Sequence, residues 1–221
     1  MANAANSPQP RDMRLSDLDD VAEVHRNCFP VSVSIFSALG NDIIKRFYAQ
    51  AVEESESIAT VLEEPGSGRV VGLAIGTMKS GFQKRFLRRH FLRFSYSIFS
   101  AFVVNPALRN ALCKRFKHIT HRLLEKHNSA SNGSSVPPAN GPEALYIILG
   151  VHSQWRGRGN AGRLVNYLVT RMFEAGAGRI LGFIPSNNLP SLKLHKRLGW
   201  NIKQISTEEV KAWVDRPDPN S

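Results

Sequence analysis

Residues 144–162 read ALYIILGVHSQWRGRGNAG, and this stretch decides the fold. Its first eight residues are almost all apolar, which is typical of a strand that is buried on both faces. A polar, glycine-rich turn follows, and the pattern from Gly159 to Ala175 predicts a helix that Gly176 is placed to end. The stretch therefore predicts a strand–turn–helix unit of a sheet covered by helices.

The turn at residues 152–162 is suited to an anionic ligand. Its glycines carry no Cβ, so the backbone can run close to a ligand. The N–H groups at the start of the following helix point outward and favour anions, above all phosphate. Arg156 and Arg158 add fixed positive charge. The alternative is an ordinary strand–helix turn that happens to be rich in glycine.

A dinucleotide site is the first specific hypothesis for this turn, because Gly157, Gly159 and Gly162 formally satisfy G-x-G-x-x-G. In that fingerprint the glycines follow their strand directly, whereas five residues separate Val151 from Gly157 here. The acid that holds a ribose about twenty residues further on is also missing, since residues 179–188 contain no Asp or Glu. The sequence context therefore argues against a dinucleotide.

The remaining patterns predict an α/β (α+β) fold in which helices cover a mixed sheet of six to seven strands. We expect strands at 11–15, 57–64, 69–78, 144–151, 179–184 and 200–206, and helices at 16–28, 41–54, 159–175 and 190–198. The turn Pro65-Gly66-Ser67-Gly68 joins the second and third strands as a hairpin.

The net charge lies in one block of the chain. Residues 79–127 hold twelve Lys and Arg against a single acid, Glu125, while the rest of the chain holds seventeen of each sign. The block also holds seven of the twelve phenylalanines. We therefore expect a single domain at 11–215, with a basic helical insertion and a low-complexity loop at 79–143 and tails at 1–10 and 216–221.

Within the insertion, one helix is expected to have an apolar face opposite a basic face. The apolar face is predicted to contain Leu87, Phe91, Phe94 and Ile98, and the basic face Arg85, Arg88, Arg89 and Arg93. A second helix is expected at 106–127, followed by the loop at 128–141. Such a block fits a lid over an acceptor pocket, a contact with anionic lipid, a contact with nucleic acid, or a solvated insertion with no further role.

Composition excludes several classes of protein. With 42% hydrophobic residues the chain can bury a core, so global disorder is excluded. Cys28 and Cys113 are too few for a disulfide framework or a four-thiolate metal site, and we expect reduced thiols in a cytoplasmic protein. The first ten residues are polar, so no secretory signal is expected there. The uncharged, apolar-rich stretch 94–108 is too short and too polar to span a bilayer.

Two motifs resemble the GNAT N-acetyltransferase superfamily. The first is [Arg/Gln]-x-x-Gly-x-[Gly/Ala] after a valine-ended strand, present here as Gln154-Trp-Arg-Gly157-Arg-Gly159. The second is an asparagine before a short helix that ends in Leu-Gly-aromatic, present as Asn188 and Leu198-Gly199-Trp200. A looser likeness, in residues 29–48 and the Arg/Phe-rich insertion, is to members found among bacterial polysaccharide and glycolipid biosynthesis proteins.

The resemblance implies acetyl-CoA as co-substrate, no metal, and direct transfer of the acetyl group to a primary amine, such as that of a nucleotide- or lipid-linked amino sugar. It implies that the pantetheine arm lies between strands 144–151 and 179–184, and that the pyrophosphate rests on the amides of the turn. The cofactor-binding residues implied are Leu149, Gly150, Val151, Arg156, Gly157, Arg158, Gly159, Asn160, Ala161, Gly162 and Asn188.

His195 is the catalytic candidate, at the position where the superfamily usually has a tyrosine that contacts the departing CoA thiolate. A neutral imidazole can donate one N–H there or serve as a base. Glu143 and Tyr146 are candidates for the general base by strand position alone, while His152 is expected to be a solvated turn residue.

The alternative function is a binding or sensory module of the same fold, whose basic insertion contacts lipid or RNA. For the enzyme itself nucleic acid is not an expected partner. Homodimer formation and peripheral contact with an anionic membrane stay open.

Overall fold

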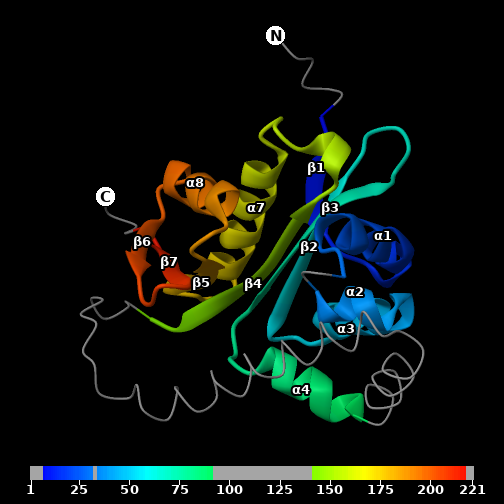
Figure 1. Ribbon diagram of the computed structural model, residues 1–221, viewed down its shortest axis with the longest axis horizontal. Coiled ribbons are helices and arrows are strands. Elements are labelled where there is room, and N and C mark those ends of the chain that lie inside the picture. The colour runs from blue at the N-terminus through cyan, green and yellow to red at the C-terminus, as the bar shows by residue number, and fades with distance from the viewer. Residues whose placement is uncertain (1–6, 32–33, 92–140, 218–221) are drawn as a thin grey trace.

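The computed structural model describes residues 7–31, 34–91 and 141–217 (Figure 1). One sheet has the strand order β1-β2-β3-β4-β5-β7-β6. The strands are β1 Gln9–Asp12, β2 Ser57–Glu63, β3 Val70–Thr77, β4 Glu143–Val151, β5 Arg179–Pro185, β6 Asn201–Gln204 and β7 Glu209–Asp215. Neighbouring strands are antiparallel except β4 and β5, which are parallel. The predicted mixed, mostly antiparallel sheet is confirmed.

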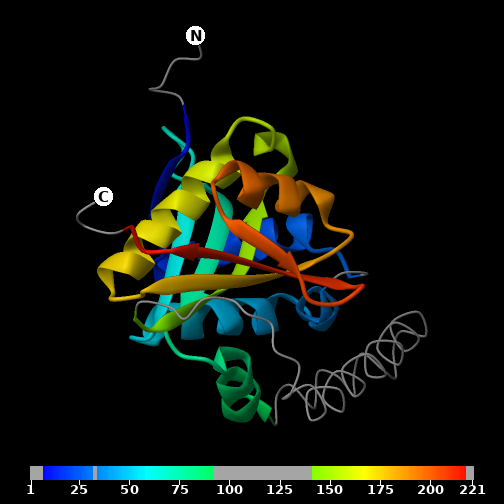
Figure 2. The same cartoon turned by 90° about the vertical axis from the view of Figure 1, so that its left-hand side faces the viewer.

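Helices cover both faces of the sheet (Figures 1 and 2). The helices of the first half are α1 Leu18–Cys28, α2 Ile35–Leu39, α3 Asn41–Glu53 and α4 Phe82–Arg89, and those of the second half are α7 Asn160–Glu174 and α8 Leu189–Arg197. Two short 3-10 turns, Leu15–Asp17 and Ser153–Trp155, precede α1 and α7.

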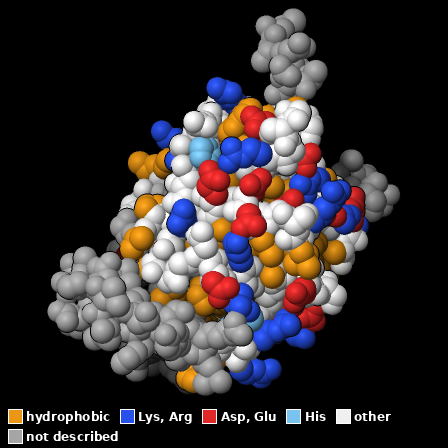
Figure 3. Space-filling model, turned by 90° about the vertical axis from the view of Figure 1, so that its right-hand side faces the viewer, with side chains coloured by type: hydrophobic (Ala, Val, Ile, Leu, Met, Phe, Trp, Pro, Cys, Tyr) orange, Lys and Arg blue, Asp and Glu red, His pale blue; other side chains and the backbone are white. Residues whose placement is uncertain are grey.

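Each face of the sheet has its own core. Under α1 and α3 the largest fully buried side chains include Ile43, Ile44 and Tyr48. On the other face, Leu164, Leu168 and Met172 of α7 are fully buried. Burial of such side chains stabilises the fold by about 1.5–3 kcal/mol each. Figure 3 shows the outer surface of the first half, where basic and acidic side chains are interspersed.

The element boundaries differ from expectation in three places. β1 begins at Gln9, two residues earlier than predicted. It is an edge strand that pairs only with β2, and an edge strand tolerates Pro10, which has no N–H to donate. The short helix α2 was not predicted. Neither was the strand at 209–215, now β7, which lies between β5 and β6 and pairs with both.

The predicted apolar face of the basic insertion is wrong where the structure describes it. Phe82 and Phe86 are buried, with ring centroids 5.2 and 5.3 Å from that of Phe47 in α3. Leu87 and Phe91 are instead 40% and 64% exposed. The helix α4 starts at Phe82, so the i, i+4 pair of phenylalanines faces the core. The predictions for residues 92–140, including the second helix and most of the loop, lie outside the described residues.

Candidate functional site

The parallel strands β4 and β5 pair over only part of their length. Their register runs from Glu143 opposite Arg179 to Tyr146 opposite Gly182, and stops there. On its other edge β4 pairs with β3 as far as Val151. That pairing shifts so that Tyr146 lies opposite Gly76 and Ile148 opposite Ile75, which leaves Ile147 as a bulge. A bulge bends and twists its strand, so the edge of β4 after Tyr146 opens away from β5.

The open edge of β4 presents backbone polar groups. The His152 N–H donates to the Val71 carbonyl at 2.8 Å, which places His152 in a hydrogen-bonded position toward β3. Because such positions alternate in an antiparallel pair, the N–H and C=O groups of Leu149 and Val151 face the open edge. The Val151 carbonyl already accepts a 2.8 Å hydrogen bond from Nε of Arg156. Leu149 is therefore the position best suited to pair with an extended ligand.

Gly150, the third residue predicted on this strand, serves packing. A Cβ at Gly150 would lie 3.0 Å from Sγ of Cys28 and 3.1 Å from Cε2 of Phe29, at the end of α1. Only glycine lets α1 approach β4 so closely. Burial raises the pKa of the Cys28 thiol, so this cysteine is protonated at neutral pH.

The glycine-rich turn is open on its outer side. Gly157 and Gly159 adopt left-handed φ angles of 78° and 77°, and a Cβ at either would meet nothing within 4 Å. The first backbone hydrogen bond of α7 runs from the Arg163 N–H to the Gly159 carbonyl. The amides of Asn160, Ala161 and Gly162 therefore precede the helical hydrogen-bond ladder and form an anion-binding helix start.

Side chains of the turn hold its shape. The Asn160 amide, 1% exposed, donates from Nδ2 to the Trp155 carbonyl at 2.8 Å. The guanidinium of Arg158 lies over the Trp155 ring, 5.3 Å from its centroid. A Cβ at Gly162 would make ordinary contact at 3.6 Å with Leu198, the residue that follows α8. The predicted turn residues thus lie together, and the contact offered to an anion comes mainly from backbone N–H groups.

The second motif forms α8. Asn188 caps this helix, because its side-chain oxygen accepts from the Ser191 N–H at 3.3 Å. His195 is fully buried, and its Nδ1 lies 2.8 Å from the Ser191 carbonyl oxygen. A carbonyl only accepts, so Nδ1 carries the proton of the neutral ring and Nε2 holds a lone pair. Burial lowers the pKa of His195, which keeps the ring neutral at pH 7.

Tyr146 of β4 meets His195 at the point where the strands diverge. Their ring centroids are 5.4 Å apart at an interplanar angle of 76°, and Trp200 closes the cluster 4.7 Å from the His195 ring. The Tyr146 hydroxyl and His195 Nε2 are both buried and have no hydrogen-bond partner in the described part of the chain. Unsatisfied buried polar atoms are rare, and they mark a place where a ligand or a moving proton can be accommodated.

The two candidates for a general base do not fit the geometry. Burial raises the pKa of the Tyr146 hydroxyl far above its ordinary value, so this phenol is a hydrogen-bond donor at neutral pH. Glu143 lies at the closed end of the β4–β5 pair, 3.8 Å from Arg179. His152 accepts from the Gln154 N–H at 3.4 Å, which is the turn role expected of it.

Among the described residues there is no cluster of three or more His, Cys, Asp or Glu side chains that could hold a metal ion. The described helices include none that is both long and apolar enough to cross a membrane.

Solved structures share this architecture. An N-acetyltransferase from Staphylococcus aureus Mu50 is 13% identical, with a TM-score of 0.54 over 94% of this chain and 98% of that one. The PaiA N-acetyltransferase of Thermoplasma acidophilum, in complex with coenzyme A, is 8% identical, with a TM-score of 0.58 over 95% and 99%. YncA of Salmonella typhimurium, solved with its cofactor acetyl-CoA, is 14% identical, with a TM-score of 0.56 over 97% and 99%.

A family model described as the acetyltransferase (GNAT) family matches residues 127–200, which include β4, the turn, α7, β5 and α8. This segment of the chain is similar to the GNAT family. The chain is also 33% identical over 70 residues to a mycothiol acetyltransferase of Corynebacterium aurimucosum. The match covers 32% of this chain and 21% of that relative, so it spans about a fifth of the relative's length.

Proposed function

We propose that this protein is an acetyl-CoA-dependent N-acetyltransferase that transfers the acetyl group directly to a primary amine of a small-molecule acceptor. One observation carries the proposal. The open edge of β4 runs from the unpartnered Tyr146 hydroxyl, past the backbone groups of Leu149, to the free amides at the start of α7. A thioester, an amide-containing arm and a pyrophosphate need these three features in that order.

The residues present fit acetyl-CoA. The amides of Asn160, Ala161 and Gly162 would hold the pyrophosphate, and the open turn at Gly157 and Gly159 gives it close access. The backbone of Leu149 would pair with the amides of the pantetheine arm. Bound in this way, acetyl-CoA supplies the activated acetyl group and a thiol leaving group.

The transfer itself needs few side chains. The amine nitrogen forms a bond to the thioester carbonyl carbon, the carbon–sulfur bond breaks, and the proton lost by the amine balances the proton gained by the thiolate. A backbone N–H at the open edge of β4 stabilises the oxyanion. Cys28 has no part as nucleophile, because its buried thiol stays protonated.

Tyr146 and His195 would act at the thioester end of acetyl-CoA. The Tyr146 hydroxyl is the donor, because it is protonated at neutral pH and has no hydrogen-bond partner among the described residues. His195 Nε2 is the neighbouring acceptor. The phenol can therefore donate its single proton to the developing thiolate, and the Nε2 lone pair beside it can act as a base.

For the acceptor we favour an amino sugar carrying a phosphate, either nucleotide- or lipid-linked. The excess of basic residues at 79–127 supports an anionic acceptor. The expected cytoplasmic location and a peripheral contact with anionic lipid belong to the same proposal.

The competing function is a binding or sensory module of GNAT fold. The burial of both Tyr146 Oη and His195 Nε2 favours it, because neither atom reaches solvent in this structure. In that case acetyl-CoA would bind without turning over.

Thiol release distinguishes the two functions. The protein is mixed with acetyl-CoA and a panel of amines that includes amino-sugar nucleotides, and free CoA is measured with a thiol reagent. Release with at least one amine, with Tyr146→Phe lowering kcat by about 10²–10⁴ at unchanged acetyl-CoA affinity, supports the enzyme. Calorimetric binding of acetyl-CoA without release for any amine supports the module.

A further inference from the structure

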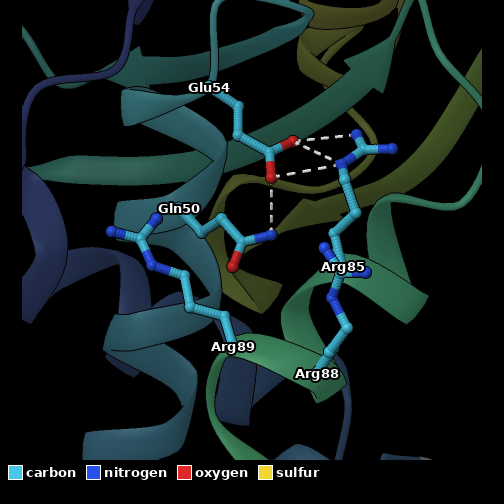
Figure 4. Close-up of a pocket in the computed structure, with 5 residues that line it drawn as sticks. All are labelled: Gln50, Glu54, Arg85, Arg88 and Arg89. Carbon is cyan, nitrogen blue, oxygen red and sulfur yellow. Dashed lines mark hydrogen bonds and ion pairs between the residues drawn. The ribbon is translucent and has the colours of Figure 1, made fainter.

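A cavity of about 340 Å³ lies between α3 and α4, on the face of the sheet opposite α7 and α8 (Figure 4). Its lining consists of Gln50 and Glu54 from the end of α3 and of Arg85, Arg88 and Arg89 from α4. The cavity shares no lining residue with the open edge of β4.

The polar groups of Arg85 and Glu54 on one wall of the cavity already hydrogen-bond to each other. Nη2 of Arg85 donates to Glu54 at 2.9 Å, and its Nε lies 3.3 Å from both carboxylate oxygens. The Gln50 amide donates from Nε2 to the same carboxylate at 2.8 Å. Because a carboxylate accepts only, this contact fixes which end of the amide is nitrogen and which is oxygen.

The opposite end of the Gln50 amide has no hydrogen-bond partner among the described residues. Gln50 is 2% exposed, and its Oε1 is buried without a donor from that part of the chain. Figure 4 shows this oxygen turned away from Glu54 toward the side where α4 carries Arg88 and Arg89. A buried acceptor in this position can take a donor from a ligand.

The cavity also holds spare positive charge. Among the described residues Arg88 forms no ion pair, and Arg89 makes only a 3.5 Å contact with Glu53, in which both side chains are about half exposed. The three arginines face two carboxylates, Glu53 and Glu54, which leaves a net charge of +1. A ligand matching this cavity is an anion that also carries a hydrogen-bond donor.

We propose that this cavity binds a phosphate monoester in its singly protonated form. Arg88, assisted by Arg89, holds the anionic oxygens, and the P–OH group donates to Oε1 of Gln50. Carboxylate and sulfate groups accept only, so they satisfy the arginines and leave Gln50 unpaired. The donor requirement therefore favours phosphate over sulfate and simple carboxylates.

The first test compares inorganic phosphate with sulfate, at about pH 6, where phosphate groups keep one proton to donate. Binding of each anion to the full chain is measured by calorimetry at constant ionic strength. Phosphate should bind about tenfold more tightly than sulfate, as expected for one additional buried hydrogen bond. Equal affinities, or no saturable binding of phosphate, would overturn the proposal.

Three variants assign the effect to the cavity. Arg88→Gln should weaken phosphate and sulfate alike by about tenfold or more. Lys84→Gln is the matched control, because Lys84 is an exposed cation on the same helix that does not line the cavity. Gln50→Met keeps the size of the side chain and should abolish the preference for phosphate. If Lys84→Gln weakens anion binding as much as Arg88→Gln does, binding depends only on the net charge of the protein, and the assignment of the site to this cavity is wrong.

Because Gln50 is buried, the fold of Gln50→Met is checked by its thermal unfolding, while Arg88→Gln changes an exposed residue and tests the site by itself. A second comparison identifies the source of the phosphate. Glycerol 3-phosphate is tested as a competitor of inorganic phosphate, and phosphatidylcholine vesicles with and without phosphatidic acid are tested by flotation. Arg88-dependent flotation only with phosphatidic acid indicates a lipid, and competition by glycerol 3-phosphate alone indicates a soluble ester. Failure of both ligands overturns the proposal.

Discussion

Tyr146 and His195 meet edge to face with their ring centroids 5.4 Å apart, and each ring carries one buried polar atom that no described residue hydrogen-bonds. Tyr146 comes from β4 and His195 from α8, so the contact joins the strand that would hold the thioester to the second sequence motif. The 2.8 Å contact between His195 Nδ1 and the Ser191 carbonyl fixes the imidazole with its lone pair at Nε2. This geometry makes the phenol the donor and the imidazole the acceptor.

Replacement of His195 tests this division of roles. We expect His195→Ala to lower kcat by about 10²–10⁴ with little change in acetyl-CoA affinity, because the ring acts at the reacting end of acetyl-CoA and not on the pyrophosphate. His195→Tyr should retain more activity than His195→Ala, since a second phenol can donate to the thiolate. Steady-state kinetics of the three proteins with one amine provides the measurement. Equal activity in all three would mean that the histidine only packs.

Gly159→Val should abolish acetyl-CoA binding, because the left-handed backbone strains a β-branched residue and its side chain fills the space above the turn. Gly66→Val is the matched control. Gly66 lies in the β2–β3 turn with φ 82° and an equally open Cβ position. Both variants should lose about 1–3 kcal/mol of stability, as expected for backbone strain. Calorimetry should detect acetyl-CoA binding in the control alone, and binding by Gly159→Val with unchanged affinity would refute the site.

Phe86 and Leu87 are neighbours on α4 with opposite environments, since Phe86 is fully buried and Leu87 is 40% exposed. Phe86→Ala should lower the free energy of unfolding by about 3–5 kcal/mol, whereas Leu87→Ala should cost under about 1 kcal/mol. Urea denaturation of both variants checks the difference. Similar costs would show that α4 does not dock on α3 through its phenylalanines.

His25 makes stability depend on pH. The imidazole is 1% exposed, with Nδ1 2.8 Å from the Tyr48 hydroxyl and Nε2 3.0 Å from Oγ of Ser34. Burial lowers its pKa to about 4, from about 6.5 in the unfolded chain. Between these values the unfolded chain binds more protons, so stability is complete above about pH 6.5 and falls as the pH drops toward 4.

The shift corresponds to a loss of about 3 kcal/mol across that range. Urea unfolding at about pH 7.5 and pH 5 should detect about 2 kcal/mol of this loss, and His25→Gln should reduce the difference between the two values. His195, whose pKa is also lowered by burial, adds to the loss in the same direction. An unchanged pH dependence in His25→Gln would contradict the assignment to His25.

Local patterns were sufficient to predict most of the sheet and its main helices. The hairpin of β2 and β3, the apolar β4 and the amphipathic α7 follow from short-range periodicity and turn residues, which need no knowledge of distant contacts. The same holds for the turn that offers its amides, because Gly157 and Gly159 are required by the left-handed backbone. The resemblance to the GNAT superfamily and the elements that carry its two motifs were therefore accessible from the sequence.

Long-range contacts determined the rest. β7 is a strand because it pairs with β5 and β6, and the buried face of α4 is set by Phe47 of α3. The opening of β4 depends on its bulge at Ile147 and on the end of its pairing with β5. The meeting of Tyr146 with His195 brings together residues 49 positions apart, and no periodicity encodes such a contact. The packing of α8 against the sheet brings Nε2 of His195, an acceptor, near the Tyr146 hydroxyl, a donor, at the opening of β4.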